Sequence, residues 1–265
     1  MVAAARPVKK FPAIVIALLL IVIIAIVARQ VGLLRQEEET PAFPYGEIRI
    51  AIDPSYAPFA TYTENGLQGL DVDLGLALSE QLHLPVRFVP MGIDGLYDSL
   101  INDQADIIIS ALVVDTWRLH EVRYSRPYFD AGLVLVSPSS APIPQMEDLP
   151  GRSLAYEFGS AADSEARRWL RLTGNFVTQP YELPEYALDA VQLGVADAAL
   201  VDMVDARLYL RQHPEAALEF HYATHLPYVI AARIDRKNTL RQINETLRTL
   251  LQNGAIETML NRWLG

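Results

Sequence analysis

Residues 105–118 read ADIIISALVVDTWR. The β-branched run at residues 107–109, behind the single Asp106, is typical of a strand that is buried on both faces. Strands of that kind occur in parallel sheets, so this stretch indicates an α/β fold. Ligands in such folds bind beyond the carboxyl ends of the strands, and we therefore expect the residues after Ile109 to lie at a binding edge.

Arg118 is the charged residue that this stretch brings to the expected edge. A planar guanidinium can meet a carboxylate through two parallel hydrogen bonds, which suits the binding of a small acid or an amino acid. The alternative is an arginine on a surface turn that is paired with Glu121 or solvated. Considered alone, the residue favours this alternative, because most surface charges contribute little.

Length and composition limit the possible functions. A chain of 265 residues can form two modest lobes or one large domain once a targeting segment is subtracted. The net charge of −10, from 32 acids and 22 bases, argues against a nucleic-acid partner. The absence of cysteine excludes disulfides, thiolate metal sites and a cysteine nucleophile, and it fits an oxidising compartment outside the cytoplasm.

The N-terminal part combines bases with an uncharged apolar run. Arg6, Lys9 and Lys10 precede residues 11–28, which are long enough to cross a bilayer as a helix. Because the bases come first, the rest of the chain is expected on the extracytoplasmic side. A cleaved signal peptide is the competing interpretation, but its apolar region is shorter, about 7 to 15 residues. We expect residues 1–29 to form a membrane anchor or signal segment, with the uncleaved anchor favoured, and residues 30–46 to be an exposed linker.

Two runs of alternating strands and helices follow the linker. The predicted strands are residues 47–52, 86–89, 133–136, 153–156, 197–201, 218–222 and 228–232. The predicted helices are 71–82, 96–101, one that opens after Ser160 and carries Trp169 and Leu170, 183–193, one that follows Asp202 and runs through Leu208, and 240–264, the last broken at Asn253-Gly254. The runs are joined near residues 129–132 and again near 224–227. This pattern predicts two lobes with a double crossover. Residues 47–129 and 228–265 would form lobe 1, and residues 132–224 would form lobe 2.

Polar residues follow several of these strands and should line a cleft between the lobes. They are Asp53, Tyr56, Arg118, Glu157, Ser160 and Asp202. Ser160 could cap a helix or lie at an anion site formed by backbone N–H groups, and the cap is favoured. Asp202 could equally be a helix cap or a ligand for a cation. One arginine facing acids suits a zwitterion, whose carboxylate would bind Arg118 and whose ammonium would bind an aspartate.

The sequence offers no metal site and no cofactor motif. The five histidines lack metal-ligand spacing. His221 and His225 are four residues apart, but Pro227 and the predicted strand argue against a shared helical face. We therefore expect neither a metal nor a cofactor.

From about Ile48 to Gly265 the chain resembles the family 3 extracellular solute-binding proteins, the amino-acid receptors of ABC importers. The matching segments are DPSYAPF at 53–59, GLDVDL at 69–74, ADII at 105–108, Arg118 with YSRPY at 124–128, ADAALVD at 196–202, and NG at 253–254 with WLG at 263–265. The resemblance implies a two-lobed clamshell of the periplasmic-binding-protein type 2 fold, with a double hinge. It also implies that Arg118 binds the ligand α-carboxylate and Asp202 the α-ammonium, while Tyr56 lines the first lobe and Asp53 approaches the ligand side chain.

The chain departs from the family pattern at positions that would contact a ligand. Val113 stands where the family has a hydroxyl residue, and Ile93 stands where an aromatic residue is usual. The usual Gly-Thr is Gly159-Ser160, preceded by Glu157. Because of these departures, the resemblance does not identify the ligand, but it still implies the fold. The complete expected lining is Asp53, Tyr56, Ser110, Ala111, Val113, Arg118, Glu157, Ser160, Ala161 and Asp202.

The sequence therefore predicts a monomeric, membrane-tethered extracytoplasmic receptor that binds a small amino acid and presents it to the permease subunits of an ABC importer. Three acids against one arginine favour a basic amino acid. One alternative is a dehydratase-like enzyme on the same scaffold with Glu157 as general acid, but Ala161 and Ala162 stand where a further acid would be needed. The other is a sensory module that acts on a partner in trans. We expect no enzyme; the ligand, the permease and cleavage of the anchor stay open.

Overall fold

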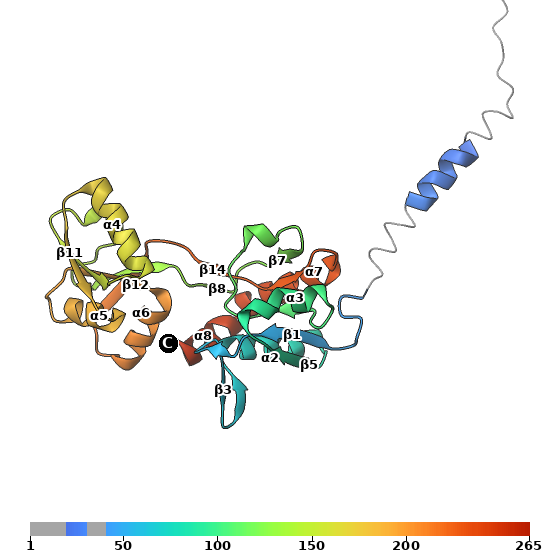
Figure 1. Ribbon diagram of the computed structural model, residues 1–265, viewed down its shortest axis with the longest axis horizontal. Coiled ribbons are helices and arrows are strands. Elements are labelled where there is room, and N and C mark those ends of the chain that lie inside the picture. Colours follow the sequence, from blue (N-terminus) through green and yellow to red (C-terminus); the bar gives the residue numbers. More distant parts are fainter. Residues whose placement is uncertain (1–19, 31–40) are drawn as a thin grey trace, which may run out of the picture.

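The computed structural model describes residues 20–30 and 41–265. Two lobes, each built on a five-stranded mixed sheet, lie side by side and are joined by two crossover segments (Figure 1). The prediction of a two-lobed α/β fold is confirmed. Residues 20–30 are helical, and among the described residues no helix is both long and apolar enough to cross a membrane. Residues 11–19 of the expected anchor and 31–40 of the expected linker lie outside the described residues.

The sheet of the first lobe is organised around the β-branched stretch at residues 107–109. Its strands, in spatial order, are β5 (Val86–Pro90), β1 (Ile48–Ile52), β6 (Ile107–Ile108), β15 (Ala231–Arg233) and β7 (Val122–Tyr124). β1 runs parallel to both β5 and β6, and β15 pairs antiparallel with β6 and β7. β6 is shorter than the predicted strand, yet it is buried at the centre of the sheet, as the β-branched sequence requires.

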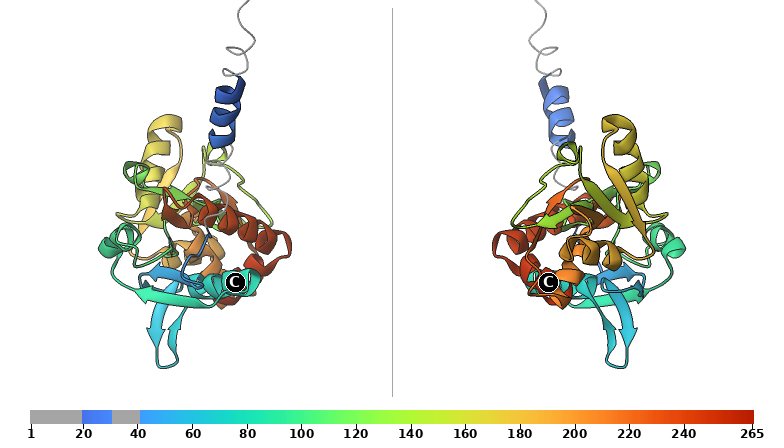
Figure 2. Two further views of the ribbon diagram at one scale, coloured as in Figure 1. Left: turned by 90° about the vertical axis from the view of Figure 1, so that its right-hand side faces the viewer. Right: turned by 90° about the vertical axis from the view of Figure 1, so that its left-hand side faces the viewer.

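Helices and a small hairpin complete the first lobe. The helices are α2 (Leu70–Leu82), α3 (Leu96–Ile101), α7 (Lys237–Gln252) and α8 (Ala255–Trp263), with short 3-10 turns η1 (Ile93–Gly95) and η2 (Thr116–Arg118). α2 packs against α7 and α8. Gly254 separates α7 from α8 in a left-handed conformation (φ 77°), so the predicted break at Asn253-Gly254 is confirmed. β2 (Ser55–Tyr56), β3 (Ala60–Thr63) and β4 (Gly66–Gln68) form an antiparallel unit, whose β3–β4 hairpin projects from the lobe (Figure 2).

The second lobe repeats the arrangement. Its strands, in spatial order, are β11 (Val177–Tyr181), β10 (Ser153–Glu157), β12 (Ala198–Asp202), β9 (Leu133–Pro138) and β13 (Leu218–Tyr222), with helices α4 (Ala161–Thr173), α5 (Pro184–Gln192) and α6 (Met203–Gln212) and the turn η3 (Met146–Asp148). β10 runs parallel to β11 and to β12. Glu157, the last residue of β10, and Asp202, the last residue of β12, therefore lie at the same edge of the sheet.

The two crossovers pair with each other between the lobes. β8 (Phe129–Asp130) is antiparallel to β14 (Pro227–Tyr228). The predicted strand over 228–232 was wrong in this respect: the structure divides it into β14 and β15, because Tyr228 pairs within the crossover and Ala231 within the first-lobe sheet. At Gly132 a Cβ atom would lie 2.1 Å from the carbonyl oxygen of Thr224, so the crossovers run too close together for a side chain.

Candidate ligand-binding site

The second lobe carries a small hollow, of about 10 Å³, at the carboxyl ends of β10 and β12. Four of the expected site residues line it: Glu157, Ser160, Ala161 and Asp202. The structure adds Asp205, one turn into α6, which the sequence analysis did not select. Asp202 and Asp205 are three residues apart at the start of a helix, and that spacing places both on one face.

Carboxylates dominate the electrostatics of this hollow. Partial burial and the negative charge of Glu157 raise the pKa of Asp202. Burial, together with the charges of Asp202, Glu157 and Glu185, raises the pKa of Asp205 to about 6. None of these four carboxylates, Glu157, Glu185, Asp202 and Asp205, forms an ion pair with a residue that the structure describes. Such a group of unpaired acids favours a cation in the hollow.

For Ser160 and Asp202, the sequence left open whether each side chain caps a helix or is available to a ligand. Ser160 is the N-cap of α4: its Oγ accepts from the backbone N–H of Asp163 (3.2 Å) and donates to the carbonyl oxygen of Glu157 (2.8 Å). Asp202 occupies the N-cap position of α6, but its side chain makes no capping hydrogen bond. The Asp202 carboxylate is thus available to a ligand, whereas Ser160 already has a structural role.

Three expected residues of the first lobe lie together at the carboxyl ends of β1 and β6. The backbone N–H of Asp53 donates to Ser110 Oγ (3.0 Å). The next residue, Ala111, has a positive φ of 45°, and its backbone N–H donates to Asp71 Oδ2 (2.6 Å). This edge of the first-lobe sheet is therefore held by hydrogen bonds rather than left as a mobile loop.

Asp71 is a structural residue that the sequence indicated only as the first residue of a predicted helix. Its side chain is fully buried, and its Oδ1 accepts from the hydroxyl of Tyr128 (2.7 Å). Burial raises the pKa of Asp71 to about 7, while the hydrogen bonds from Tyr128 and Ala111 oppose the shift. Asp71 thereby links the start of α2 to the loop after β6 and to the first crossover.

Tyr56 lies on aromatic residues next to the crossovers. Its ring stacks on Phe59 with centroids 5.3 Å apart and an interplanar angle of 12°, and about half of the residue stays exposed (48%). Phe59 in turn contacts Phe129 and Tyr228, one from each crossover. An exposed aromatic face beside the hinge fits the expected role of Tyr56 in lining the first lobe.

Arg118 is paired within its own lobe. Its Nη1 donates to Glu121 Oε2 (3.1 Å), and its guanidinium carbon lies 4.8 Å from the ring centroid of Tyr97. This is the pairing with Glu121 that the sequence raised as the alternative. Val113 and Ile93 are both exposed, so each offers aliphatic surface.

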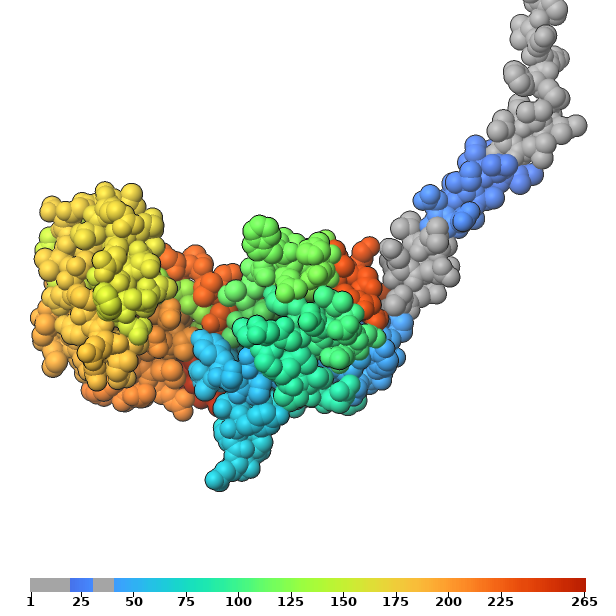
Figure 3. Space-filling model, in the orientation of Figure 1, coloured from blue at the N-terminus to red at the C-terminus, as the bar shows by residue number. Residues whose placement is uncertain are grey.

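The structure assembles the expected residues in separate groups on the two lobes. Glu157, Ser160, Ala161 and Asp202 share the second-lobe hollow, which no first-lobe residue lines. The lobes are parted on the side where the crossovers are visible between them (Figure 3). Arg118 and the acids therefore do not meet in this conformation.

Comparison with known proteins places the chain in a family. The family of bacterial extracellular solute-binding proteins, family 3, matches residues 48–265. The chain belongs to this family. The resemblance seen in the sequence is thereby confirmed, and the family is extracytoplasmic.

Relatives of known description are similar over most of the chain. A "probable amino-acid ABC transporter-binding protein" of Haemophilus influenzae is 26% identical, covering 82% of this chain and 84% of the relative. An arginine-binding extracellular protein of Bacillus subtilis is 23% identical (78% and 82%). A cyclohexadienyl dehydratase of Pseudomonas aeruginosa is 26% identical (83% and 83%), so the scaffold also carries an enzyme.

Solved structures agree with the fold. An ancestral cationic amino-acid solute-binding protein is 27% identical with a TM-score of 0.60, covering 83% of this chain and 96% of that one. The L-cystine solute receptor of Neisseria gonorrhoeae, in an unliganded open conformation, has a TM-score of 0.71 at 20% identity, covering 84% and 95%. At that identity the second comparison supports the fold alone.

Proposed function

We propose that this protein is an extracytoplasmic receptor that binds a cationic amino acid between its two lobes. The observation that carries the proposal is the acidic hollow of the second lobe, where Asp202, Asp205 and Glu157 lack ion-pair partners among the described residues. Asp202 would bind the ligand α-ammonium. Asp205 and Glu157 would favour a positively charged side chain.

The first lobe supplies the group for the opposite end of the ligand. Arg118 would leave Glu121 and bind the α-carboxylate through two parallel hydrogen bonds. Tyr56 would cover the ligand beside the hinge, with Asp53, Ser110, Ala111 and Val113 forming the rest of that wall. The relatives described as binding arginine or cationic amino acids support this ligand class.

Closure of the lobes would bring these groups together. Lobe 1 would comprise residues 47–129 and 228–265, and lobe 2 residues 132–224, with β8 and β14 as the hinge. A ligand that contacts both lobes binds the closed form more tightly than the open one, and it therefore shifts the population toward closure.

The proposal also includes delivery to a membrane partner. The apolar segment at residues 11–28 would anchor the protein in the cytoplasmic membrane, and the closed monomer would present its ligand to the permease subunits of an ABC importer. A role as a sensor acting on another protein would use the same closure. Co-purification with a permease rather than with a sensor protein would separate the two.

A ligand screen tests the receptor function. Every buried core residue of the described chain lies at Ala42 or later, so a fragment of residues 41–265 retains the whole core. Thermal unfolding of that fragment with a panel of amino acids should show a rise in melting temperature with arginine, lysine or histidine, because a ligand stabilises the state it binds. No rise with any amino acid would contradict the proposal.

An enzyme on the same scaffold is the second candidate. Asp205, with a pKa of about 6, would be partly protonated near neutral pH and could donate a proton in the hollow. We expect no turnover, because Ala161 and Ala162 offer no second acid after Ser160. Incubation with prephenate and arogenate measures this directly, and product formation would favour the dehydratase.

A further inference from the structure

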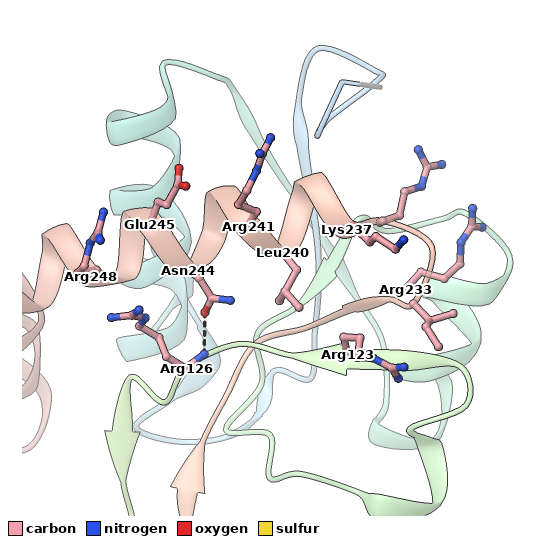
Figure 4. Close-up of a pocket in the computed structure, with 11 residues that line it drawn as sticks. Arg123, Arg126, Arg233, Lys237, Leu240, Arg241, Asn244, Glu245 and Arg248 are labelled. Carbon is pink, nitrogen blue, oxygen red and sulfur yellow. Dashed lines mark hydrogen bonds between the residues drawn. The ribbon is translucent and has the colours of Figure 1, made fainter. Parts of the chain in front are cut away.

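A second hollow, of about 410 Å³, lies on the first lobe and includes none of the expected ligand-binding residues. Helix α7 forms one side of it and contributes Lys237, Arg241 and Arg248, together with a single acid, Glu245. Arg241 and Arg248 are seven residues apart, two turns of helix, and therefore lie on one face of α7. Figure 4 shows both guanidinium groups extending from the helix on that face.

The other side of this hollow comes from distant parts of the sequence. Arg123 and Arg126 belong to β7 and the segment after it, and Arg233 lies at the end of β15 (Figure 4). Arg236, at the N-cap position of α7, also lines the hollow. The backbone N–H of Arg126 donates to Asn244 Oδ1 on α7 (2.7 Å), which fixes one side against the other. We use the name basic groove for the surface formed by the basic residues that line this hollow, which are Arg123, Arg126, Arg233, Arg236, Lys237, Arg241 and Arg248.

Only some of these bases are engaged in the fold. Arg233 forms two hydrogen bonds with Asp235 (2.6 and 2.9 Å), and Arg236 contacts Asp103 at 3.4 Å. By contrast, the exposed side chains of Arg126, Arg241 and Arg248 form no ion pair within the described part of the chain. In a protein of net charge −10, this local excess of positive charge is complementary to an anionic partner.

The chain reaches the first lobe beside the same helix. Ala42 and Phe43 are buried, and the carbonyl oxygen of Ala42 accepts from Thr239 Oγ1 on α7. Residues 29–41 separate Ala42 from the apolar segment, and a fully extended chain of that length spans at most about 45 Å. If residues 11–28 anchor the protein as proposed above, the anchor holds the basic groove close to the lipid surface.

We propose that the basic groove docks on the anionic phospholipid head groups of the membrane that holds the anchor. Guanidinium groups bind phosphate oxygens through paired hydrogen bonds, and an open groove with charges spread along it fits a surface of many anions. The acidic remainder of the protein is repelled by the same surface. Docking therefore orients the first lobe with α7 toward the lipid. This inference rests on the proposed anchor.

Vesicle co-sedimentation of residues 41–265 tests the groove without the anchor. The fragment should bind vesicles that contain phosphatidylglycerol more tightly than vesicles of pure phosphatidylcholine, and high salt should remove the difference. The variant Arg241→Gln/Arg248→Gln should bind about 25-fold more weakly, since each basic residue near an anionic bilayer strengthens binding about fivefold. The control Arg152→Gln/Arg171→Gln removes two second-lobe charges and should bind as the unchanged fragment does.

Several results would overturn the inference. Equal binding to both kinds of vesicle, or an equal loss in both double variants, would mean that the groove does not recognise lipid. If soluble glycerol phosphate binds the fragment as tightly as the vesicles do, the groove is a site for a small free anion instead. Flotation of the full chain with pure phosphatidylcholine vesicles reports on the anchor separately, and amino-acid titration of the double variant reports on the receptor function.

Discussion

The two walls of the candidate cleft differ in how far they are prepared for a ligand. In the second lobe, Asp202 and Asp205 have raised pKa values and no ion-pair partners in the described chain, so they gain from any cation that enters. In the first lobe, Arg118 is already paired with Glu121 and lies over Tyr97. In the proposed binding mode, the acids of the second lobe would bind the ligand directly, whereas Arg118 would exchange the carboxylate of Glu121 for that of the ligand. An amino acid should therefore bind the second lobe first and recruit Arg118 on closure.

The largest expected effect is that of removing Arg118. Arg118→Ala leaves the ligand carboxylate without its partner in the closed cleft, and affinity for L-arginine should fall roughly 30-fold to several-thousand-fold. Isothermal titration measures the loss. Arg171→Ala, which removes an exposed charge in the second lobe, should retain the original affinity. An unchanged affinity in the Arg118 variant would exclude this residue from the site.

Substitution at Asp202 should be the next largest effect and should differ from substitution at Asp205. Asp202→Asn removes a charged hydrogen bond to the α-ammonium, worth about 1.5–3 kcal/mol, for every amino acid that binds. Asp205→Asn should weaken only ligands with a cationic side chain. Titration of both variants with arginine and with a neutral amino acid makes the distinction. Equal losses for both ligands in the Asp205 variant would contradict the assignment.

The pH dependence should separate ligand binding from stability. Below about pH 6 Asp205 becomes protonated, so affinity for arginine should fall as the pH is lowered from neutrality. Stability should change in the opposite direction. Because the folded-state pKa of Asp205 is raised above its unfolded value, the ligand-free protein gains about 1 kcal/mol as the pH falls through 6, and loses it as the pH rises.

Thermal unfolding and titration across this range measure both trends. Asp205→Asn should flatten the arginine-binding profile near pH 6 and should raise the melting temperature of the ligand-free protein at neutral pH. Asp71, with a pKa of about 7, changes stability in the same direction in the original protein and in the Asp205→Asn variant. The contribution of Asp205 is therefore the difference between the stability profiles of these two proteins. Identical profiles would show that Asp205 does not control binding.

The smallest effect concerns the internal partner of Arg118. Glu121→Gln weakens the ion pair that the ligand must replace, so affinity for arginine should rise about threefold, in line with the small free energies of exposed ion pairs. Titration calorimetry measures the gain. A loss of affinity would mean that Glu121 positions Arg118 for the ligand instead of competing with it.

Local sequence patterns were sufficient for much of the fold. Helix α3 and the break at Gly254 follow directly from apolar spacing and from a glycine at a helix end. The division of residues 228–232 between β14 and β15 could not be seen, because it depends on pairing with β8 and β6, which are about a hundred residues away. Pairing partners of that kind are a property of the tertiary structure.

The candidate site was predictable only where local sequence patterns reveal it. Acids at strand ends were visible in the sequence, and Glu157 and Asp202 do share one hollow. Asp205 was missed because its raised pKa arises from burial and from neighbours that the fold brings near. The basic groove was missed because its arginines come from residues 123–126 and 233–248, and only the packing of α7 on the sheet brings them together.

The central claim is that one amino acid is held between both lobes, and a distance across the cleft tests it most directly. The chain has no cysteine, so His120→Cys and Tyr186→Cys, both exposed and on opposite lobes, allow two spin labels to be attached selectively. With arginine added, we expect the distribution of distances between the labels to move to shorter values, and this shift should be absent in an Arg118→Ala background. A distribution that arginine leaves unchanged, while arginine demonstrably binds, would contradict closure around the ligand.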